Sequence, residues 1–293
     1  MLGHIVRAHP VIRAALWTGG TLLSFMLMAV AGRELSKELG IFEILTMRSL
    51  IGLIVIGALL GRSDLRRVAT GRPVLHAMRN VSHLVGQYGW FYGIAFIPLA
   101  EVFAIEFTSP VWTALLASLF LGERLTKPRI TAIACGFAGV LLILRPGFAV
   151  VHIAVIAVLI GSLGYAVSHV LTKKLSVTEK PLTILFYMSV IQFPLGLVPA
   201  SFNWVTPTAA MWPWLLAVGL TSLTAHYCIT RAFLLADATV VVPLDFLRLP
   251  LGALAGYLLY GESVESIVYV GAAVILFGNL FNLYSERARK PAT

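Results

Sequence analysis

The sequence predicts an all-α polytopic membrane protein with ten transmembrane helices, arranged as two inverted five-helix repeats. Three observations lead to this prediction: the composition, the length of the apolar runs and an internal repeat. Of the 293 residues, 59% are hydrophobic and 12% are charged, whereas a soluble domain has roughly 25% charged residues. A soluble chain of this length would need far more polar surface to cover its core.

The apolar residues form long runs, and most charges lie between them. Each run approaches the ~20 residues that cross the hydrocarbon core of a bilayer. Backbone polar groups in lipid must be satisfied within the segment, so we expect helices; barrel strands would show short alternating segments instead. The expected spans are 12–32, 41–60, 74–97, 99–121, 128–146, 150–172, 181–201, 212–235, 238–260 and 265–285. The first run lacks a small-residue cleavage site and should remain as a spanning helix.

An internal repeat is indicated by matches that share one offset of 139 positions. They are Gly122-Glu123 with Gly261-Glu262, Gln87-Tyr88 with His226-Tyr227, and Glu106 with Asp245. Such a register favours duplication. We therefore expect one transmembrane domain over 1–293, with a first repeat over 12–146 and a second over 150–285. Since five helices per repeat is an odd number, the second repeat should cross in the opposite direction.

The positive charges indicate the orientation. With the N-terminus in the cytoplasm, 15 of the 22 Lys and Arg residues fall in inner segments, three in outer segments and four inside expected helices. This bias predicts a multi-pass protein of a bacterial cytoplasmic (inner) membrane with both termini cytoplasmic. The net charge of +9 follows this topology, so no nucleic-acid partner is expected.

Several short motifs resemble one known family. They are Pro-Leu-Ala-Glu at 98–101, Pro110, Leu-Gly-Glu-Arg-Leu-Thr at 121–126, Leu-Ala-Asp-Ala-Thr at 235–239 and Gly261-Glu262. Together they resemble the two repeats of the EamA branch of the drug/metabolite transporter superfamily, although no second Pro-Leu-Ala-Glu is present. The resemblance covers nearly the whole chain, and implies a central cavity and transport of small metabolites, amino acids and their derivatives among them.

Polar residues recur at intervals of three or four along 74–97: His76, Arg79, His83, Gln87 and Trp90. This spacing puts them on one helix face, which we expect to line the cavity. The alternatives are an interhelical hydrogen-bond seam and, for the first two, snorkelling to lipid headgroups.

Two acids lie inside expected spans at equivalent positions of the repeat, Glu106 and Asp245. Pro110 should kink the first of these helices. Arg248 follows Asp245 by three residues, so the site offers both charge signs to a zwitterionic or amphiphilic substrate, or contains an intrahelical ion pair. Either carboxylate is a candidate for a coupling proton.

Arg48 is another costly charge inside a span and a candidate for binding a substrate carboxylate or phosphate. The expected substrate-binding residues are Arg48, Arg79, His83, Gln87, Trp90, Glu106, Tyr165, His226, Asp245 and Arg248.

No zinc motif, nucleophile elbow or phosphate-binding loop occurs in the sequence. We therefore expect no enzyme activity, no cofactor and no metal. A secondary transporter working by alternating access is the leading hypothesis, with export favoured; import of a vitamin or nucleoside-like metabolite and multidrug export are alternatives. A lipid-active intramembrane enzyme and a passive channel are further alternatives. The expected partners are a small-molecule substrate, membrane lipids and a second copy in a homodimer.

Overall fold

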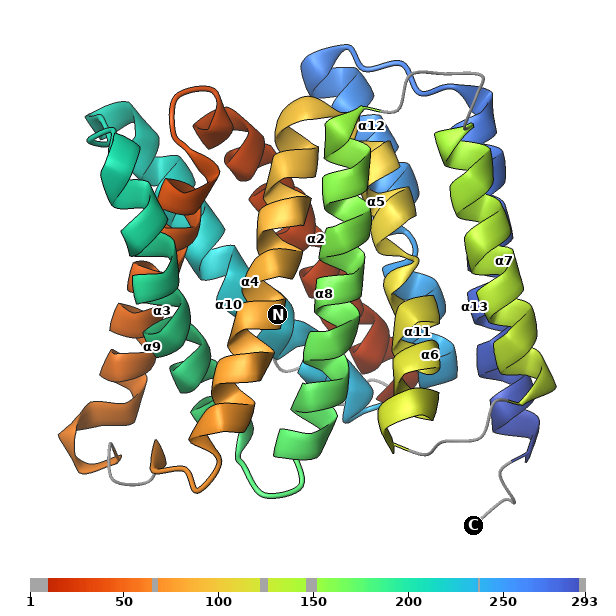
Figure 1. Ribbon diagram of the computed structural model, residues 1–293, viewed down its shortest axis with the longest axis horizontal. Coiled ribbons are helices and arrows are strands. Elements are labelled where there is room, and N and C mark those ends of the chain that lie inside the picture. The colour runs from red at the N-terminus through yellow and green to blue at the C-terminus, as the bar shows by residue number, and fades with distance from the viewer. Residues whose placement is uncertain (1–9, 65–67, 122–125, 146–151, 237, 290–293) are drawn as a thin grey trace.

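The computed structural model describes residues 10–64, 68–121, 126–145, 152–236 and 238–289, and this part of the chain is helical without strands. The helices are α2 (Pro10–Ser36), α3 (Ile41–Asp64), α4 (Pro73–Phe96), α5 (Leu99–Glu106), α6 (Ser109–Leu121), α7 (Lys127–Leu144), α8 (Ile153–Leu175), α9 (Pro181–Ala200), α10 (Trp212–Phe233), α11 (Ala238–Asp245), α12 (Arg248–Tyr260) and α13 (Ser266–Arg289), with short 3-10 helices η2 (Ser201–Asn203) and η3 (Ala209–Met211). They stand side by side as one bundle (Figure 1).

The surface of the bundle is apolar and its interior holds polar groups. Leu23, Leu59 and Leu119 are about 70% exposed, whereas His76 and Asn80 are fully buried. By length and composition, eight segments can cross a membrane, and two of these combine α5 with α6 and α11 with α12. This pattern is that of a multi-pass membrane protein.

The helices α4 and α10 are absent from those eight segments. They have 24 and 22 residues, enough at 1.5 Å per residue to cross a bilayer of ~30 Å. Polar residues reduce their hydropathy, among them the polar stripe expected on α4 and, on α10, His226, the counterpart of Gln87 in the repeat.

The segments expected at 99–121 and 238–260 are each interrupted by a short turn, at 107–108 and 246–247. Proline explains the first break: Pro110 has no N–H to donate to the carbonyl of Glu106, four residues before it. The carbonyl of Phe107 is also left outside the helix, and it accepts a hydrogen bond from Asn279 Nδ2 at 2.9 Å. The breaks place Glu106 and Asp245 at helix ends inside the bundle.

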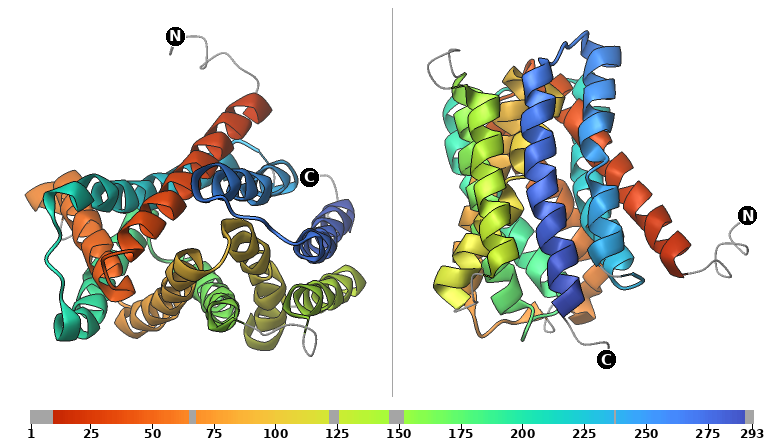
Figure 2. Two further views of the ribbon diagram at one scale, coloured as in Figure 1. Left: turned by 90° about the horizontal axis from the view of Figure 1, so that it is seen from above. Right: turned by 90° about the vertical axis from the view of Figure 1, so that its right-hand side faces the viewer.

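The helix starts repeat with the offset seen in the sequence. Four pairs of helices begin 139 residues apart: Pro73 and Trp212, Leu99 and Ala238, Ser109 and Arg248, and Lys127 and Ser266. The packing is also reciprocal, since α2 packs on α10 and α4 on α8, while α3 packs on α9, α5 on α12 and α7 on α13. In Figures 1 and 2 the α3/α9 pair and the α7/α13 pair lie at opposite edges.

Glycines allow the closest of these contacts. A Cβ on Gly89 of α4 would collide with the carbonyl oxygen of Ala157 on α8, and one on Gly139 of α7 would lie 2.5 Å from the carbonyl oxygen of Gly271 on α13. Small residues let helix backbones approach in this way. The glycines at 136, 139, 271 and 278 all pack against neighbouring helices of the same chain.

Candidate functional site

A cavity of about 550 Å³ lies inside the bundle, between helices of both halves of the chain. Its wall includes residues in the middle of α4, at the α5/α6 and α11/α12 breaks and on α3, α8 and α10. It also includes Arg129 near the start of α7, Lys173 near the end of α8 and Phe233 at the end of α10. These three helix ends lie at one end of the bundle, the lower one in Figure 1, so the cavity extends toward that end.

Three charged side chains form a group at the two helix breaks. Arg248 donates from Nη1 to Glu106 Oε1 at 3.0 Å and from Nη2 to Asp245 Oδ2 at 2.6 Å. The remaining oxygen of Glu106, Oε2, accepts a hydrogen bond from the indole of Trp90 at 2.9 Å. The ion pair between Asp245 and Arg248 is therefore present, and Glu106 joins it from the other half of the chain. Arg248 therefore offsets one of the two negative charges that the ionised acids would offer to a substrate.

Aromatic rings surround the Arg248 guanidinium. The ring centroids of Phe25 and Phe107 lie 4.5 and 5.1 Å from it, within the range of cation–π attraction. Phe107 also meets Phe246 edge to face, with centroids 4.8 Å apart. These rings occupy equivalent positions after Glu106 and Asp245, so both breaks present an aromatic side chain to the cavity.

A second group of polar residues also lines the cavity. Arg48 is 5% exposed and has no hydrogen bond or ion pair within the described part of the chain. Glu43, a possible partner for it, instead accepts hydrogen bonds from the backbone N–H groups of Gly40 and Val205. His83 and His226 lie nearby, with ring centroids 6.2 Å apart, and the ring of Tyr165 meets that of His83 edge to face at 5.4 Å.

The structure places nine of the ten expected residues around this cavity. They are Arg48, His83, Gln87, Trp90, Glu106, Tyr165, His226, Asp245 and Arg248. Arg79 lies outside its wall, contrary to the expectation for the α4 stripe. It donates from Nε to Thr172 Oγ1 at 3.2 Å and from Nη1 to Asn80 Oδ1 at 2.7 Å, so its charge is used in helix packing.

His76 also lies outside the cavity. Its ring packs 4.4 Å from that of Tyr187, and Nε2 is 3.9 Å from a carboxylate oxygen of Glu179. All five residues of the α4 stripe are buried, but their surroundings differ. The first two pack against neighbouring helices, and the last three line the cavity.

Sequence reasoning missed several residues of the wall. Arg129 and Lys173 were assigned to connecting segments as topology signals, and Phe25 carried no polar signal at all. Gln192 lies outside the wall but bonds to His83, and it is not among the predicted residues. An isolated amide inside an expected span was the available signal for it.

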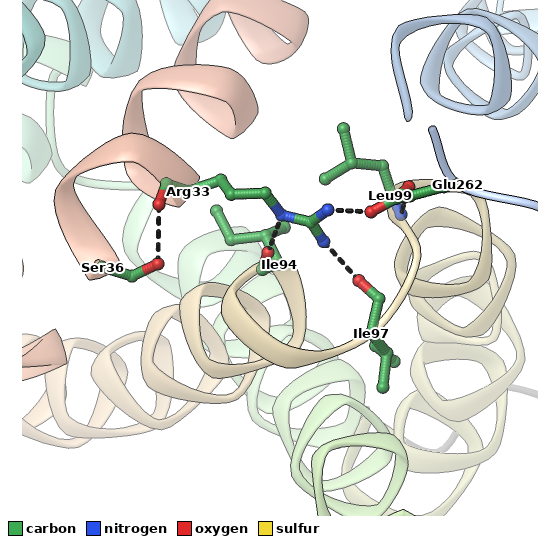
Figure 3. Close-up of polar contacts among 6 residues, drawn as sticks. All are labelled: Arg33, Ser36, Ile94, Ile97, Leu99 and Glu262. Atoms are coloured by element: carbon green, nitrogen blue, oxygen red, sulfur yellow. Dashed lines mark hydrogen bonds and ion pairs between the residues drawn. The ribbon is translucent and has the colours of Figure 1, made fainter. Parts of the chain in front are cut away.

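The opposite end of the bundle is closed by contacts around Arg33 at the end of α2 (Figure 3). Arg33 forms an ion pair with Glu262, which follows α12, and donates to the backbone carbonyls of Ile94 and Ile97. Glu262 also accepts from the backbone N–H of Leu99, the first residue of α5, at 2.9 Å. We call this group the Arg33–Glu262 seal. Glu123, which matches Glu262 in the sequence repeat, lies outside the described residues.

A second ion pair lies at the same end, outside the spans. Arg145 Nη2 is 2.7 Å from Glu265 Oε2. The hydrogen bond and the charge of Arg145 hold the pKa of the Glu265 carboxyl below its usual range.

The cavity is large enough to hold a small molecule. Within the described residues, no group of three His, Cys, Asp or Glu side chains is arranged to hold a metal ion. A buried binding site in a membrane bundle, reached toward one end and sealed at the other, is what a membrane carrier requires.

Comparison with known proteins gives the class. The sequence profile of the EamA-like transporter family matches residues 12–145 and 152–284, and the chain belongs to this family. It is 34% identical to a riboflavin transporter of Rhizobium johnstonii, over 98% of this chain and 97% of that protein. It is 26% identical to an S-adenosylmethionine uptake transporter of Rickettsia conorii, over 92% of each chain. A pseudopaline exporter of Pseudomonas aeruginosa is 30% identical over 86% of this chain and 89% of its own length.

One solved crystal structure superposes with a TM-score of 0.64 at 18% identity, covering 97% of this chain and 100% of that one. This likeness concerns the fold alone. The family and the relatives make this chain a metabolite transporter, not an enzyme.

Proposed function

We propose that the protein is a secondary transporter of the cytoplasmic membrane that works by alternating access. Its ten spans would be the eight apolar segments together with α4 and α10, in two inverted repeats with both termini cytoplasmic. The equal offset of four helix starts and the reciprocal packing of α2 on α10 and α4 on α8 support such a repeat. The cavity between the halves supplies the site, and the Arg33–Glu262 seal closes the outer side.

We propose a planar, hydrogen-bonding vitamin or nucleoside-like metabolite as the substrate, carried inward. The observation that carries this proposal is the cavity wall, in which the unpaired amide of Gln87 lies among the rings of Trp90, Phe91 and Tyr165. Ligand sites of this kind combine an apolar, aromatic lining with a few polar groups. Riboflavin and S-adenosylmethionine, named for two relatives, both contain a planar nitrogen heterocycle.

A second candidate is export of a zwitterionic, amino-acid-derived metabolite. The presence of both charge signs in the wall favours it, with Arg48, Glu106 and Asp245 as the binding groups. The relative named as a pseudopaline exporter supports the outward direction. The contacts of both acids argue against it, because Arg248 and Trp90 already occupy both oxygens of Glu106 and one oxygen of Asp245, so an ammonium group would have to compete for them.

Proton coupling would act through the acids at the helix breaks. Protonation of Glu106 or Asp245 would free one side of Arg248 and weaken the contact between the two halves. Transport by the Glu106→Gln and Asp245→Asn variants should then lose its dependence on a proton gradient. Wild-type dependence in both variants would refute the coupling.

The substrate proposal is tested by ligand-dependent thermal stability of the purified protein in detergent. A ligand at 100 times its Kd stabilises the folded state by about 2.7 kcal/mol, so a substrate raises the melting temperature measurably. We expect shifts with riboflavin or S-adenosylmethionine that disappear in Gln87→Ala and persist in Ser82→Ala, an α4 variant outside the cavity wall. Shifts with zwitterions alone would favour the second candidate, and shifts that persist in Gln87→Ala would place binding elsewhere.

A further inference from the structure

Arg48 is a buried cation that faces the cavity without an anionic partner. Its side chain is 5% exposed, it lines the cavity, and no ion pair or hydrogen bond reaches it from the described residues. Arg248, in the same cavity, is bound by two carboxylates. Because a buried charge is costly unless it is paired, the difference singles out Arg48 as the group whose partner arrives with a ligand.

Gln87 lines the same cavity and also lacks hydrogen-bond partners. It is 3% exposed, and neither its amide oxygen nor its amide nitrogen has a hydrogen-bond partner in the part of the chain that the structure describes. Buried side-chain polar atoms are usually satisfied. An amide with both atoms unpaired beside a cavity therefore indicates a ligand group that bonds to it.

The tautomer of His83 follows from its contact with Gln192. The amide nitrogen of Gln192 donates to the carbonyl of Asn80 at 3.2 Å and lies 3.0 Å from His83 Nδ1. A backbone carbonyl only accepts, which fixes the orientation of the Gln192 amide, and its second hydrogen is directed at Nδ1. Nδ1 is then the acceptor, so the neutral ring carries its proton on Nε2.

We propose that Arg48, His83 and Gln87 form a donor wall that binds oxygen acceptors of the substrate, and that Gln192 is the positioning residue that keeps His83 a donor. This inference rests on the proposed transport function and names the substrate chemistry at one side of the site. The wall presents the guanidinium of Arg48, the Nε2–H of His83 and the amide N–H groups of Gln87.

The carboxylate acceptors of the cavity wall are largely used within the protein. Both oxygens of Glu106 and one oxygen of Asp245 already accept hydrogen bonds. A substrate therefore binds most tightly when its oxygen acceptors, with full or partial negative charge, face the donor wall. Two kinds of group supply this chemistry: a carboxylate, or the paired carbonyl oxygens of an imide-type ring edge.

The first experiment measures binding of three probes by thermal shift and by equilibrium dialysis. S-adenosylmethionine offers a carboxylate, its decarboxylated form lacks that group, and riboflavin offers ring carbonyls. The loss of one hydrogen bond to a charged group corresponds to a roughly tenfold to hundredfold rise in Kd. We expect this rise in Arg48→Met and Gln87→Met, a smaller rise in Arg48→Lys, and wild-type affinity in Arg231→Met, which removes an arginine outside the cavity wall.

The probes also separate the two acceptor groups. Weak binding of the decarboxylated form to the wild type indicates a carboxylate, and riboflavin binding that depends on Arg48 indicates ring carbonyls. Probes that bind the wild type and the Arg48→Met and Gln87→Met variants equally well would overturn the donor wall and leave the transport proposal standing. Absence of binding to the wild type would instead count against the proposed substrates.

The second experiment needs no ligand. Nitrogen-15 NMR of the histidine-labelled protein, with His83 assigned through the His83→Asn variant, reports which ring nitrogen carries the proton. We expect protonated Nε2 in the wild type and a mixture of tautomers in Gln192→Leu, with weaker probe binding although Gln192 lies behind the wall. A proton on Nδ1 in the wild type would overturn the assignment of His83 as a donor.

Discussion

The two ends of the bundle hold their charges in different ways. At the end with the Arg33–Glu262 seal, Arg33 and Arg145 have carboxylate partners, and the contacts of Arg33 and Glu262 join α2, the α4–α5 connection and the segment after α12. At the other end, Arg129 and Lys173 lie in the wall of the cavity. One end therefore joins the two halves through an ion pair, and we expect a ligand to enter the cavity from the other.

Removal of the seal should have the largest effect. Arg33→Ala leaves the Glu262 carboxylate unpaired and two backbone carbonyls without their donor, and both side chains of the pair are nearly buried. We expect a loss of about 3 kcal/mol in the free energy of unfolding, measured by thermal or denaturant unfolding in detergent.

The matched control is Lys37→Ala, which removes an ion pair with Glu34 at the same end. That lysine side chain is 57% exposed, so we expect a loss below about 0.5 kcal/mol. Equal losses in the two variants would show that the seal does not hold this end together.

Access to the cavity should differ between the two sides of the membrane. A cysteine at Thr113 in the cavity wall should react with an impermeant maleimide added at the end with Lys173, and one at Ser36 should react only from the opposite side. The protein's own Cys135 and Cys228 are first replaced by alanine. Removal of Arg33 should then let Thr113→Cys react from both sides.

Equal labelling of Thr113→Cys from both sides in the presence of Arg33 would contradict the closed outer end. The Ser36→Cys variant reports the orientation of the protein in the same vesicles.

The cations at the open end should produce a moderate effect. Lys173→Gln and Arg129→Gln should raise the KM for an acceptor-rich substrate several-fold, and more strongly at low ionic strength, because they attract the substrate into the cavity. Lys180→Gln, at the same end and outside the cavity wall, is the control in transport assays. If the KM did not depend on ionic strength in any of these three variants, attraction of the substrate by Arg129 and Lys173 would be contradicted.

Removal of the exposed ion pair between Arg145 and Glu265 should have the smallest effect on stability. The pKa of Glu265 is lowered by Arg145, so its carboxylate stabilises the fold at neutral pH, and this stabilisation is lost as the pH falls through the folded-state pKa. The wild type should therefore melt slightly above Glu265→Gln near neutral pH, and together with it once the pH lies below the folded-state pKa of Glu265. A melting difference that grew at acid pH would contradict this linkage.

Much of the fold could be predicted from local sequence. The starts expected at 41, 181, 212 and 238 agree with α3, α9, α10 and α11, because prolines and the change from polar to apolar residues determine where these helices begin. The breaks at 107–108 and 246–247 were not predicted as interruptions. The first depends on a distant partner, since Asn279 satisfies the exposed carbonyl of Phe107.

The site could be predicted in part. An ionisable or amide side chain inside a span already indicates a buried function, and this signal found Arg48, Gln87, Glu106 and Arg248. It could not separate Arg79, which packs against Thr172 on α8, from its neighbours on the same helix face. Which cation is neutralised by other residues depends on contacts between the two halves, which are not visible in local sequence.

The reciprocal packing of the helices also bears on how the protein is made. The main partner of α4 is α8, and that of α2 is α10, so the earliest helices meet their principal neighbours only after the ribosome has produced the later ones. During synthesis the glycine face of α4 would be exposed to lipid or to the insertion machinery until α8 enters the membrane. The first half therefore reaches the bilayer as an incomplete assembly, whose final shape is set by the arrival of the second.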